Sequence, residues 1–174
     1  ENYFKINNFD VVLNFAGINY DTLIHKINDS NINEINNLID VNIKGSINVT
    51  SSCLKSMREN KYGRIIHISS VLSEKNVIGT SIYSATKSFL DKFVKNISLE
   101  NIKYHITANT IQLGYFDGGL TEKVPQEVLS NVLKMIPLKR LGMVSEMSNL
   151  VSTIIETEYI NGTNLSITGA YENE

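Results

Sequence analysis

Short apolar runs alternate with longer stretches of helical periodicity along this chain, and this alternation restricts its fold more than any other feature. The apolar runs are rich in β-branched residues and poor in charge; they cover residues 10–15, 63–70, 105–111 and 159–167, the last beginning with a turn. Between them, apolar residues recur at helical spacing over 32–60, 83–100 and 145–157. Uninterrupted apolar runs of this length are typical of strands buried in a parallel sheet. The order therefore predicts an α/β fold with right-handed β-α-β crossovers.

The length and charge of the chain limit its function. Its 174 residues, 42% of them hydrophobic, suffice for one domain, spanning 1–174. The formal net charge is −2 and the lysines and arginines are scattered, which argues against nucleic-acid binding. No apolar run approaches the ~18 residues of a membrane span, and the N-terminal sequence lacks the form of a signal peptide. We therefore expect a cytoplasmic protein without membrane contact.

Cysteine and histidine give no sign of a disulfide or a metal site. Cys53 is the single cysteine and is expected to be a buried, reduced thiol. His67 alternates with isoleucines on a predicted strand, whereas His25 and His105 lack acidic or cysteine partners at ligand spacing. We predict no bound metal.

The segment from Ser70 to Lys87 carries the residues best suited to chemistry. Ser70 ends an apolar run, Tyr83 follows thirteen residues later, and Lys87 lies four residues beyond it. Residues four apart share a helix face, with about 5–6 Å between their Cβ atoms. A nearby ammonium group is expected to lower the pKa of the tyrosine towards working pH. Tyr83 is thus a candidate general acid or base, and Ser70 a candidate to orient a carbonyl oxygen. The Tyr-x-x-x-Lys spacing alone also occurs in ordinary helices.

The long helical stretch over 32–60 contains an expected interruption. Asn42 and Gly45 lie in its middle, within Val-Asn-Ile-Lys-Gly. An asparagine competes for backbone hydrogen bonds and can bend a helix.

These segments resemble the short-chain dehydrogenase/reductases, in which a strand-end serine, a tyrosine and a lysine at this spacing form the active site. Asn-Phe-Ala-Gly at 14–17 resembles the family's Asn-Asn-Ala-Gly element on the fourth strand. Asn-Thr-Ile-Gln-Leu-Gly at 109–114 resembles the Asn-x-x-x-Pro-Gly segment ending the sixth. Asn42 stands 28 residues before Ser70, where the family has an asparagine that holds a proton-relay water. The alternative is an incidental asparagine in an Asn-rich chain.

The resemblance implies a set of site residues. The catalytic residues it implies are Ser70, Tyr83, Lys87 and Asn42. The residues it implies for binding NADPH or NADH are Asn14, Phe15, Ala16, Gly17, Tyr83, Lys87, Gly114 and Phe116. Where the family has a second asparagine and a proline, this chain has Phe15 and Leu113, so backbone groups near Phe116 are expected to contact the nicotinamide. Residues 115–136, hinged at Gly118 and Gly119, would form the substrate lid; the alternative is an ordinary surface loop and helix.

The resemblance also implies the C-terminal two thirds of a Rossmann-type, doubly wound parallel sheet. Residues 1–10 are expected to be the end of the helix before the fourth strand and a loop. The sequence contains no glycine-rich phosphate-binding turn. Either the sequence is a piece of a longer chain, or the cofactor half has been lost. We favour the first, because the strand at Val11 would otherwise be an exposed apolar edge.

Within this family, the resemblance is closest to the reductases of 3-oxoacyl thioesters on acyl carrier protein, which serve fatty-acid synthesis. The sequence segments on which this resemblance rests include Val-Asn-Ile-Lys-Gly at 41–45 and Ile-Pro-Leu-Lys-Arg-Leu-Gly at 136–142. Lys61 and Arg64 are expected beside the site entrance, where they could meet an acidic carrier protein. The alternatives are a reductase of another small carbonyl, such as a sugar or polyol derivative, and a non-catalytic interaction module.

The resemblance further implies a homo-oligomer, a dimer or a tetramer, built on the helices over 34–60 and 83–100. The apolar residues compatible with that interface are Leu54, Met57, Phe89, Phe93 and Ile97. Packing within one subunit is the alternative explanation for them.

Overall fold

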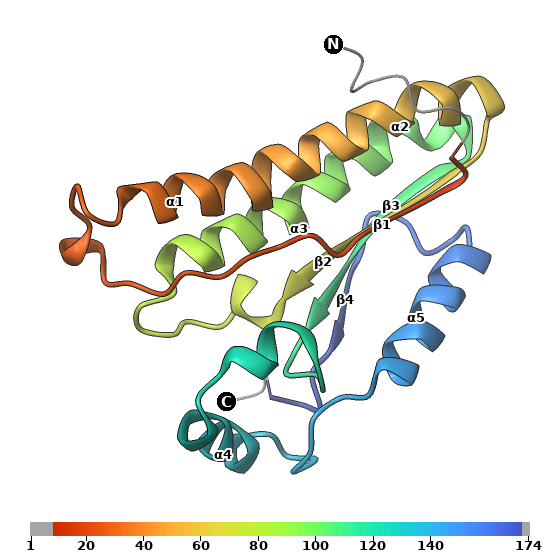
Figure 1. The fold of residues 1–174 in the computed structure, drawn as a ribbon. Helices are drawn as coiled ribbons and strands as arrows, with labels where there is room; N and C mark the ends of the chain where they lie inside the picture. Colours follow the sequence, from red (N-terminus) through yellow and green to blue (C-terminus); the bar gives the residue numbers. More distant parts are fainter. Residues whose placement is uncertain (1–8, 172–174) are drawn as a thin grey trace.

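Four parallel strands form one sheet in the order β1-β2-β3-β4, as Figure 1 shows for the computed structural model, which describes residues 9–171. The strands are β1 (Val11–Asn14), β2 (Gly63–Ser70), β3 (Ile106–Leu113) and β4 (Asn164–Ile167). In the register of the sheet, Leu13 lies opposite Ile66, which lies opposite Asn109. The predicted α/β fold with a parallel sheet is confirmed. The helix end and loop predicted for residues 1–10 fall almost entirely outside the described residues.

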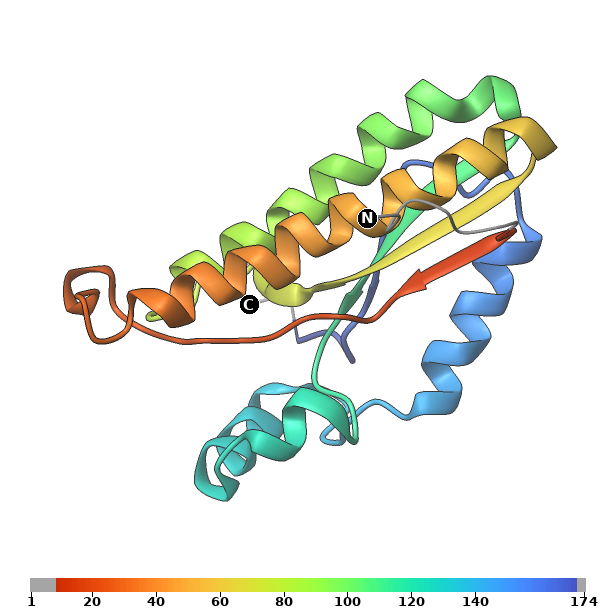
Figure 2. The same cartoon turned by 45° about the horizontal axis from the view of Figure 1, so that its top comes forward.

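Helices cover both faces of the sheet, and short helical turns connect them. The long helices are α1 (Ile32–Ile39), η2 (Asp40–Gly45, a π-helix), α2 (Ser46–Asn60), α3 (Ser81–Asn101), α4 (Gln126–Met135) and α5 (Val144–Glu156). The short turns are η1 (Ile24–Lys26), η3 (Val71–Ser73), η4 (Ile102–Tyr104) and η5 (Gly119–Lys123). The rod of α1, η2 and α2 runs beside α3 over one face, and α5 lies on the other (Figure 2).

Two apolar clusters fix these layers. Under α2 and α3, buried residues include Val12, Met57, Ile65, Val94 and Ile97. Under α5, they include Ile66, Ile68, Ile111, Val151 and Ile154. Met57 and Ile97, which the sequence left open to a subunit interface, are therefore core residues. The side chains of β2 are buried along the whole strand, because this central strand has a strand on each side and helices on both faces.

The predicted interruption of the first helix is present, and its form is a π-helix over Asp40–Gly45. π-Helices are rare and occur mostly as single turns inside α-helices, frequently at functional sites. The Asn42 side chain does not bond within its own helix; it reaches Ile18 and Thr86 instead. The sequence thus located the interruption correctly, whereas the expected cause, local competition for backbone hydrogen bonds, was wrong.

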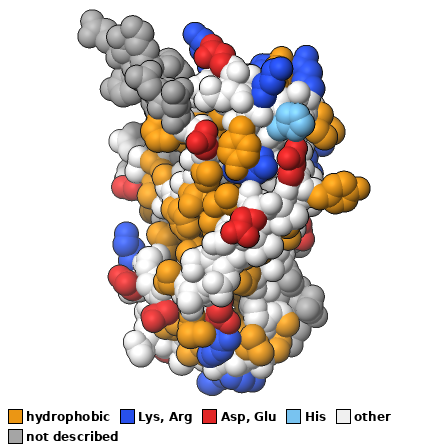
Figure 3. Space-filling model, turned by 90° about the vertical axis from the view of Figure 1, so that its right-hand side faces the viewer, with side chains coloured by type: hydrophobic (Ala, Val, Ile, Leu, Met, Phe, Trp, Pro, Cys, Tyr) orange, Lys and Arg blue, Asp and Glu red, His pale blue; other side chains and the backbone are white. Residues whose placement is uncertain are grey.

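Within the described residues, β1 forms the edge of the sheet. Val12 is buried against α2, while Leu13 points to the opposite face and is 42% exposed. Phe9 and Phe15, which flank the strand, are also exposed. Figure 3, viewed from the α5 side, shows hydrophobic side chains gathered on this face. Within residues 9–171, β1 is therefore an edge strand flanked by exposed apolar side chains. The expectation that the sequence is a piece of a longer chain stays a prediction.

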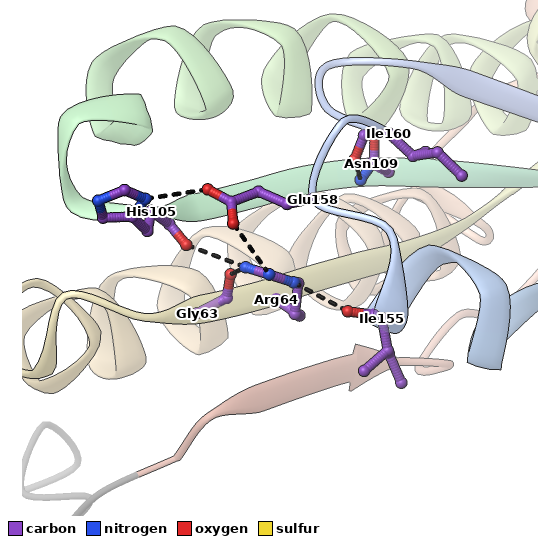
Figure 4. Close-up of polar contacts among 7 residues, drawn as sticks. All are labelled: Gly63, Arg64, His105, Asn109, Ile155, Glu158 and Ile160. Atoms are coloured by element: carbon purple, nitrogen blue, oxygen red, sulfur yellow. Dashed lines mark hydrogen bonds and ion pairs between the residues drawn. The ribbon is translucent and has the colours of Figure 1, made fainter.

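Lys61 and Arg64 do not lie beside the candidate site, because both are at the amino end of β2, so that expectation was wrong. Arg64 is at the amino end of β2, opposite the end that carries Ser70, and its side chain is buried. Its guanidinium donates hydrogen bonds to the carbonyl oxygens of Gly63, His105 and Ile155 at 2.9–3.0 Å, and its Nη2 lies 3.7 Å from Glu158 (Figure 4). Arg64 therefore fastens the start of β2 to the ends of α5 and η4, and it cannot bind a carrier protein.

Candidate active site

The carboxyl ends of the strands bring the predicted catalytic residues together. β2 ends at Ser70, η3 turns the chain away, and α3 starts at Ser81, so that Tyr83 and Lys87 occupy its first two turns. All three predicted residues are buried, being 8%, 7% and 4% exposed respectively. In open α/β sheets this edge is where ligands bind. The convergence of the Ser70 and Tyr83 hydroxyls with the Lys87 ammonium therefore defines the candidate active site.

Tyr83 has a raised pKa, which corrects the expectation that Lys87 lowers it. Burial is the largest cause, a hydrogen bond from the Ser70 hydroxyl partly opposes it, and the Asp21 carboxylate raises it further. The Lys87 Nζ lies over the phenol ring of Tyr83, 5.7 Å from its centroid. A raised pKa keeps the phenol protonated at neutral pH, which suits a general acid.

Lys87 is a buried ammonium group held by the sheet. Its Nζ donates to the carbonyl oxygen of Ile68 at 2.9 Å. Burial lowers the pKa of Lys87 to about 8, and the Asp91 carboxylate works against that shift. Lys87 therefore remains largely protonated at neutral pH. A Cβ atom at Gly17 would lie 3.2 Å from this Nζ, so the glycine lets the loop after β1 pass close to the charge.

Asn42 clamps this loop from the π-helix. Its Oδ1 accepts from the Ile18 amide at 2.9 Å, and its Nδ2 donates to the Ile18 carbonyl oxygen and the Thr86 hydroxyl, both at 3.0 Å. Thr86 lies on α3 between Tyr83 and Lys87. The Asn42 side chain thus ties the loop after β1 to the catalytic helix. A proton relay through water at Asn42 stays a prediction.

Asn14 lies inside a buried hydrogen-bond network. Its Oδ1 accepts from the Ala16 amide at 3.1 Å, and its Nδ2 contacts the Ser46 hydroxyl and Nδ1 of His67, both at 3.0 Å. Since the amide nitrogen donates to Nδ1, the other ring nitrogen of His67 carries the hydrogen and donates to Thr50 at 2.9 Å. The Asn14 side chain is thus used to shape the loop at Ala16.

His67 makes this network sensitive to acid. Burial, aided by the Lys87 charge, lowers its pKa from 6.5 to about 4. Between these two values the unfolded chain takes up a proton that the folded chain rejects, so the free energy of unfolding falls as the pH falls. Between about pH 7 and about pH 5 we expect the titration of His67 to lower the free energy of unfolding by about 2 kcal/mol.

Urea denaturation of the wild type and of His67→Asn at these two pH values tests this. The asparagine Oδ1 can accept from Asn14 in place of Nδ1, but it does not titrate. The variant should lose about 2 kcal/mol less than the wild type on acidification. Equal losses in both proteins would contradict the prediction.

The other predicted cofactor residues lie at the same edge of the sheet. Phe15 is half exposed after β1. Gly114 directly follows β3, and a Cβ there would lie 2.9 Å from the Thr168 Cα, so the approach of the segment after β4 already requires glycine. The Phe116 ring is buried against Gly142, where a Cβ would come within 2.7–2.8 Å of it. Contact of these groups with a nicotinamide stays a prediction.

The predicted lid, 115–136, consists of η5, α4 and the chain between them. Gly118 and Gly119 both have positive φ, at 97° and 62°, which suits the glycines predicted as its hinge. Val132 and Ile136 of the lid pack with Val71 and Tyr171, and Tyr115 stacks edge-on against Tyr171 with ring centroids 5.7 Å apart. The base of the lid therefore rests on the turn that follows Ser70.

Sequence reasoning missed two buried polar groups behind the site. Asp91 on α3 accepts from Thr110 and Gln112 of β3, at 2.9 and 2.8 Å. Gln112 also accepts from Ser166 of β4 and donates to Glu74 after η3, at 2.7 and 3.1 Å. The one available signal was Asp91 standing four residues beyond Lys87, on the apolar face of the helix.

Among residues 9–171, no group of three or more histidine, cysteine or acidic side chains is arranged to hold a metal ion. In the same part of the chain, no helix has the length and apolar character needed to cross a membrane. Cys53 is buried, as expected, and burial raises the pKa of its thiol.

A parallel sheet with a serine, a tyrosine and a lysine at its carboxyl edge marks the chain as a dehydrogenase or reductase of the α/β class. Residues 3–129 match the family model described as short chain dehydrogenase. The 3-oxoacyl-[acyl-carrier-protein] reductase of Buchnera aphidicola is 33% identical over 169 residues, covering 96% of this chain and 68% of that protein. The acetoacetyl-CoA reductase of Cupriavidus necator is 29% identical over 167 residues, covering 95% and 67%.

A solved structure agrees with these relatives. A gluconate 5-dehydrogenase from Burkholderia cenocepacia, in complex with NADP and tartrate, superposes with a TM-score of 0.89 at 25% identity, covering 98% of this chain and 67% of that one. The chain therefore belongs to the short-chain dehydrogenase family, whose members are oxidoreductases acting on carbonyl or hydroxyl groups. It spans about two thirds of the length of the proteins it matches.

Family members use NAD(H) or NADP(H), and the described residues fit one part of such a nucleotide. The glycine at 17 leaves room beside the Lys87 ammonium that a Cβ would fill. Lys87, Gly17 and Tyr83 would therefore hold the nicotinamide end. The sequence contains no glycine-rich turn for the phosphates, so it does not indicate whether NADH or NADPH is used.

Proposed function

We propose that the protein is an NAD(P)H-dependent carbonyl reductase that converts 3-oxoacyl thioesters to 3-hydroxyacyl thioesters, with acyl carrier protein as the carrier in fatty-acid synthesis. The observation that carries the proposal is the buried convergence of Ser70, Tyr83 and Lys87 at the carboxyl edge of the sheet. The similarity to reductases of 3-oxoacyl and acetoacetyl thioesters supports the substrate class.

In this proposal, the reduced nicotinamide supplies a hydride to the ketone carbon. The Ser70 hydroxyl donates a hydrogen bond that orients the ketone oxygen. Tyr83, kept protonated by its raised pKa, gives its proton to that oxygen as the alcohol forms. The Lys87 ammonium then stabilises the phenolate left on Tyr83. Asn42 holds the loop at Ile18 against α3, so that this arrangement keeps its geometry.

Exposed apolar side chains in the segments that follow β2 and β3 support an acyl substrate over a polyol. Val77 and Ile78, in the loop between η3 and α3, are 40% and 91% exposed. The lid adds Leu120 and Val128, at 42% and 49%. Exposed apolar groups beside a candidate site favour a ligand with a hydrocarbon portion.

The proposal is tested by following NADPH and NADH oxidation by the full chain with acetoacetyl-CoA, and separately with a 5-keto sugar acid. We expect turnover with the thioester at a kcat/KM at least about tenfold above that with the sugar acid. Preference for the sugar acid would instead support the polyol alternative. Absence of both turnover and nucleotide binding by calorimetry would support a non-catalytic interaction module.

We also propose a homo-oligomer, a dimer or a tetramer, formed through α2 and α3. Exposed apolar residues on these helices support it; they include Ile47, Val49 and Leu99, at 40%, 38% and 73% exposed.

A further inference from the structure

Lys87 and Asp91 are buried charges without an ion pair. Three lysine, arginine or acidic side chains are buried among residues 9–171, namely Arg64, Lys87 and Asp91, at 4%, 4% and 7% exposed. Arg64 has Glu158 as its partner. No salt bridge within 4.0 Å forms at Lys87 or Asp91 in this part of the chain. Burying a charge is costly unless another group compensates it, so both need an explanation.

The Asp91 carboxylate is held by neutral groups alone. The Thr110 hydroxyl donates to Oδ1 at 2.9 Å, and the Gln112 amide donates to Oδ2 at 2.8 Å. These bonds fix the position of the carboxylate but leave its negative charge uncompensated. The interaction of this charge with its surroundings is therefore long in range and weakly screened.

Lys87 is the buried opposite charge closest to Asp91 along α3, since Lys92 and Lys95 are exposed. Tyr83, Lys87 and Asp91 follow at intervals of four residues on α3, so they lie on one face in successive turns. The Lys87 Nζ turns towards the Ile68 carbonyl oxygen at 2.9 Å. The phenol, the ammonium and the carboxylate thus form a row through the interior of the protein.

We infer that Asp91 is a positioning residue for the proposed reaction, a buried counter-charge that keeps Lys87 protonated while Tyr83 gives up its proton. The inference rests on the proposed function. Burial alone would lower the pKa of Lys87 further than to about 8, and Asp91 acts in the opposite direction. The carboxylate does this from the side of Lys87 away from Tyr83, so it does not compete for the phenol proton.

The other charged or titratable groups around Lys87 cannot replace Asp91. His67 of β2 is neutral above its pKa of about 4. Asp21, in the loop after β1, and Glu74, after η3, are both exposed, so solvent screens them. Tyr83 on α3 and Tyr115 after β3 have raised pKa values and are uncharged at neutral pH. The π-helix side contributes Asn42, which is neutral.

The test is Asp91→Asn, which removes the charge and can keep the hydrogen bonds. The Thr110 hydroxyl also lies 3.0 Å from Asn164 Oδ1, so it can donate there and accept from the new amide, while Gln112 still has an oxygen to donate to. The ¹³Cε resonance of Lys87, assigned with Lys87→Arg, reports its titration without any turnover. We expect it to titrate about one pH unit lower than in the wild type, and the alkaline limb of kcat to shift equally.

Matched variants separate charge from structure. Glu74→Gln removes the exposed carboxylate that shares the Gln112 amide, and it should leave the titration of Lys87 in place. Asp91→Glu keeps the negative charge, so in this variant Lys87 should titrate as it does in the wild type. If Asp91→Asn does not fold, Asp91→Ser is the neutral variant to be measured in its place. An unchanged Lys87 titration in the neutral variants would overturn the inference, even if the reductase assay fails.

Discussion

Replacing Tyr83 with phenylalanine is expected to lower kcat for thioester reduction by about 10²–10⁴-fold, the range that a positioned general acid contributes. The ring still fills its buried place, so the fold should persist. The variant loses the hydroxyl that bonds to Ser70 and carries the proton. Because this group acts only as the carbonyl oxygen gains charge, the loss should fall on kcat, with KM nearly unchanged.

Steady-state oxidation of NADPH or NADH at saturating acetoacetyl-CoA measures this. Tyr171→Phe is the matched control, since Tyr171 is a second buried tyrosine, and its ring packs against Tyr115 and the lid. It should keep its kcat within about twofold of the wild type. A Tyr83→Phe enzyme of near-normal kcat would remove Tyr83 from the mechanism.

Replacing Lys87 with methionine is expected to reduce kcat by about 10²-fold or more and to make the protein more stable. Burial lowers the pKa of Lys87 from 10.5 to about 8, so holding the protonated ammonium in the folded state costs about 3 kcal/mol near neutral pH. Methionine fills a similar volume without that cost. The gain is smaller than the full cost, because Asp91 loses its counter-charge and the Ile68 carbonyl loses a donor. We expect about 1–2 kcal/mol.

The pH dependence of unfolding tests whether the charge of Lys87 lowers the stability of the folded protein, as predicted. Between pH 8 and 10.5 the unfolded wild type keeps a proton that the folded state releases, so its stability should rise with pH in this window. Lys87→Met should lack that rise. Urea denaturation at about pH 7 and about pH 10 gives both quantities. A methionine variant less stable than the wild type at neutral pH would show that Lys87 contributes to the fold, against this prediction.

The sequence predicted the parts of the site that are local along the chain. One strand, one turn and one helix carry Ser70, Tyr83 and Lys87. The periodicity of the apolar residues and the spacing of these three were therefore enough to predict that they share a site. The interruption at Asn42 was located for the same reason. The strands and long helices followed from the alternation of apolar runs with helical periodicity, with ends displaced by a few residues.

What the sequence did not give depends on contacts between distant segments. The bonds from Asn42 to Ile18, from Asn14 to His67 and from Asp91 to Gln112 join different elements, and nothing in their spacing reveals them. The pKa of Tyr83 was predicted in the wrong direction because burial, which the sequence does not reveal, is the largest cause and raises it. Arg64 was placed on the surface because cations usually lie there, whereas here backbone carbonyl groups surround it.

The π-helix at Asp40–Gly45 has a consequence for how this chain tolerates insertions and deletions. A π-helical turn holds one residue more than an α-helical turn, so removing a single residue from this stretch would leave a regular α-helix. In an α-helix each residue turns the chain by about 100°. A single-residue deletion elsewhere in the rod of α1 and α2 would therefore rotate α1 against α2 and carry the buried Ile35 and Leu38 away from the core. A deletion at the π-helical turn removes only its extra residue, so it should keep α1 in phase with the core and disturb only the contacts of Asn42 with Ile18 and Thr86.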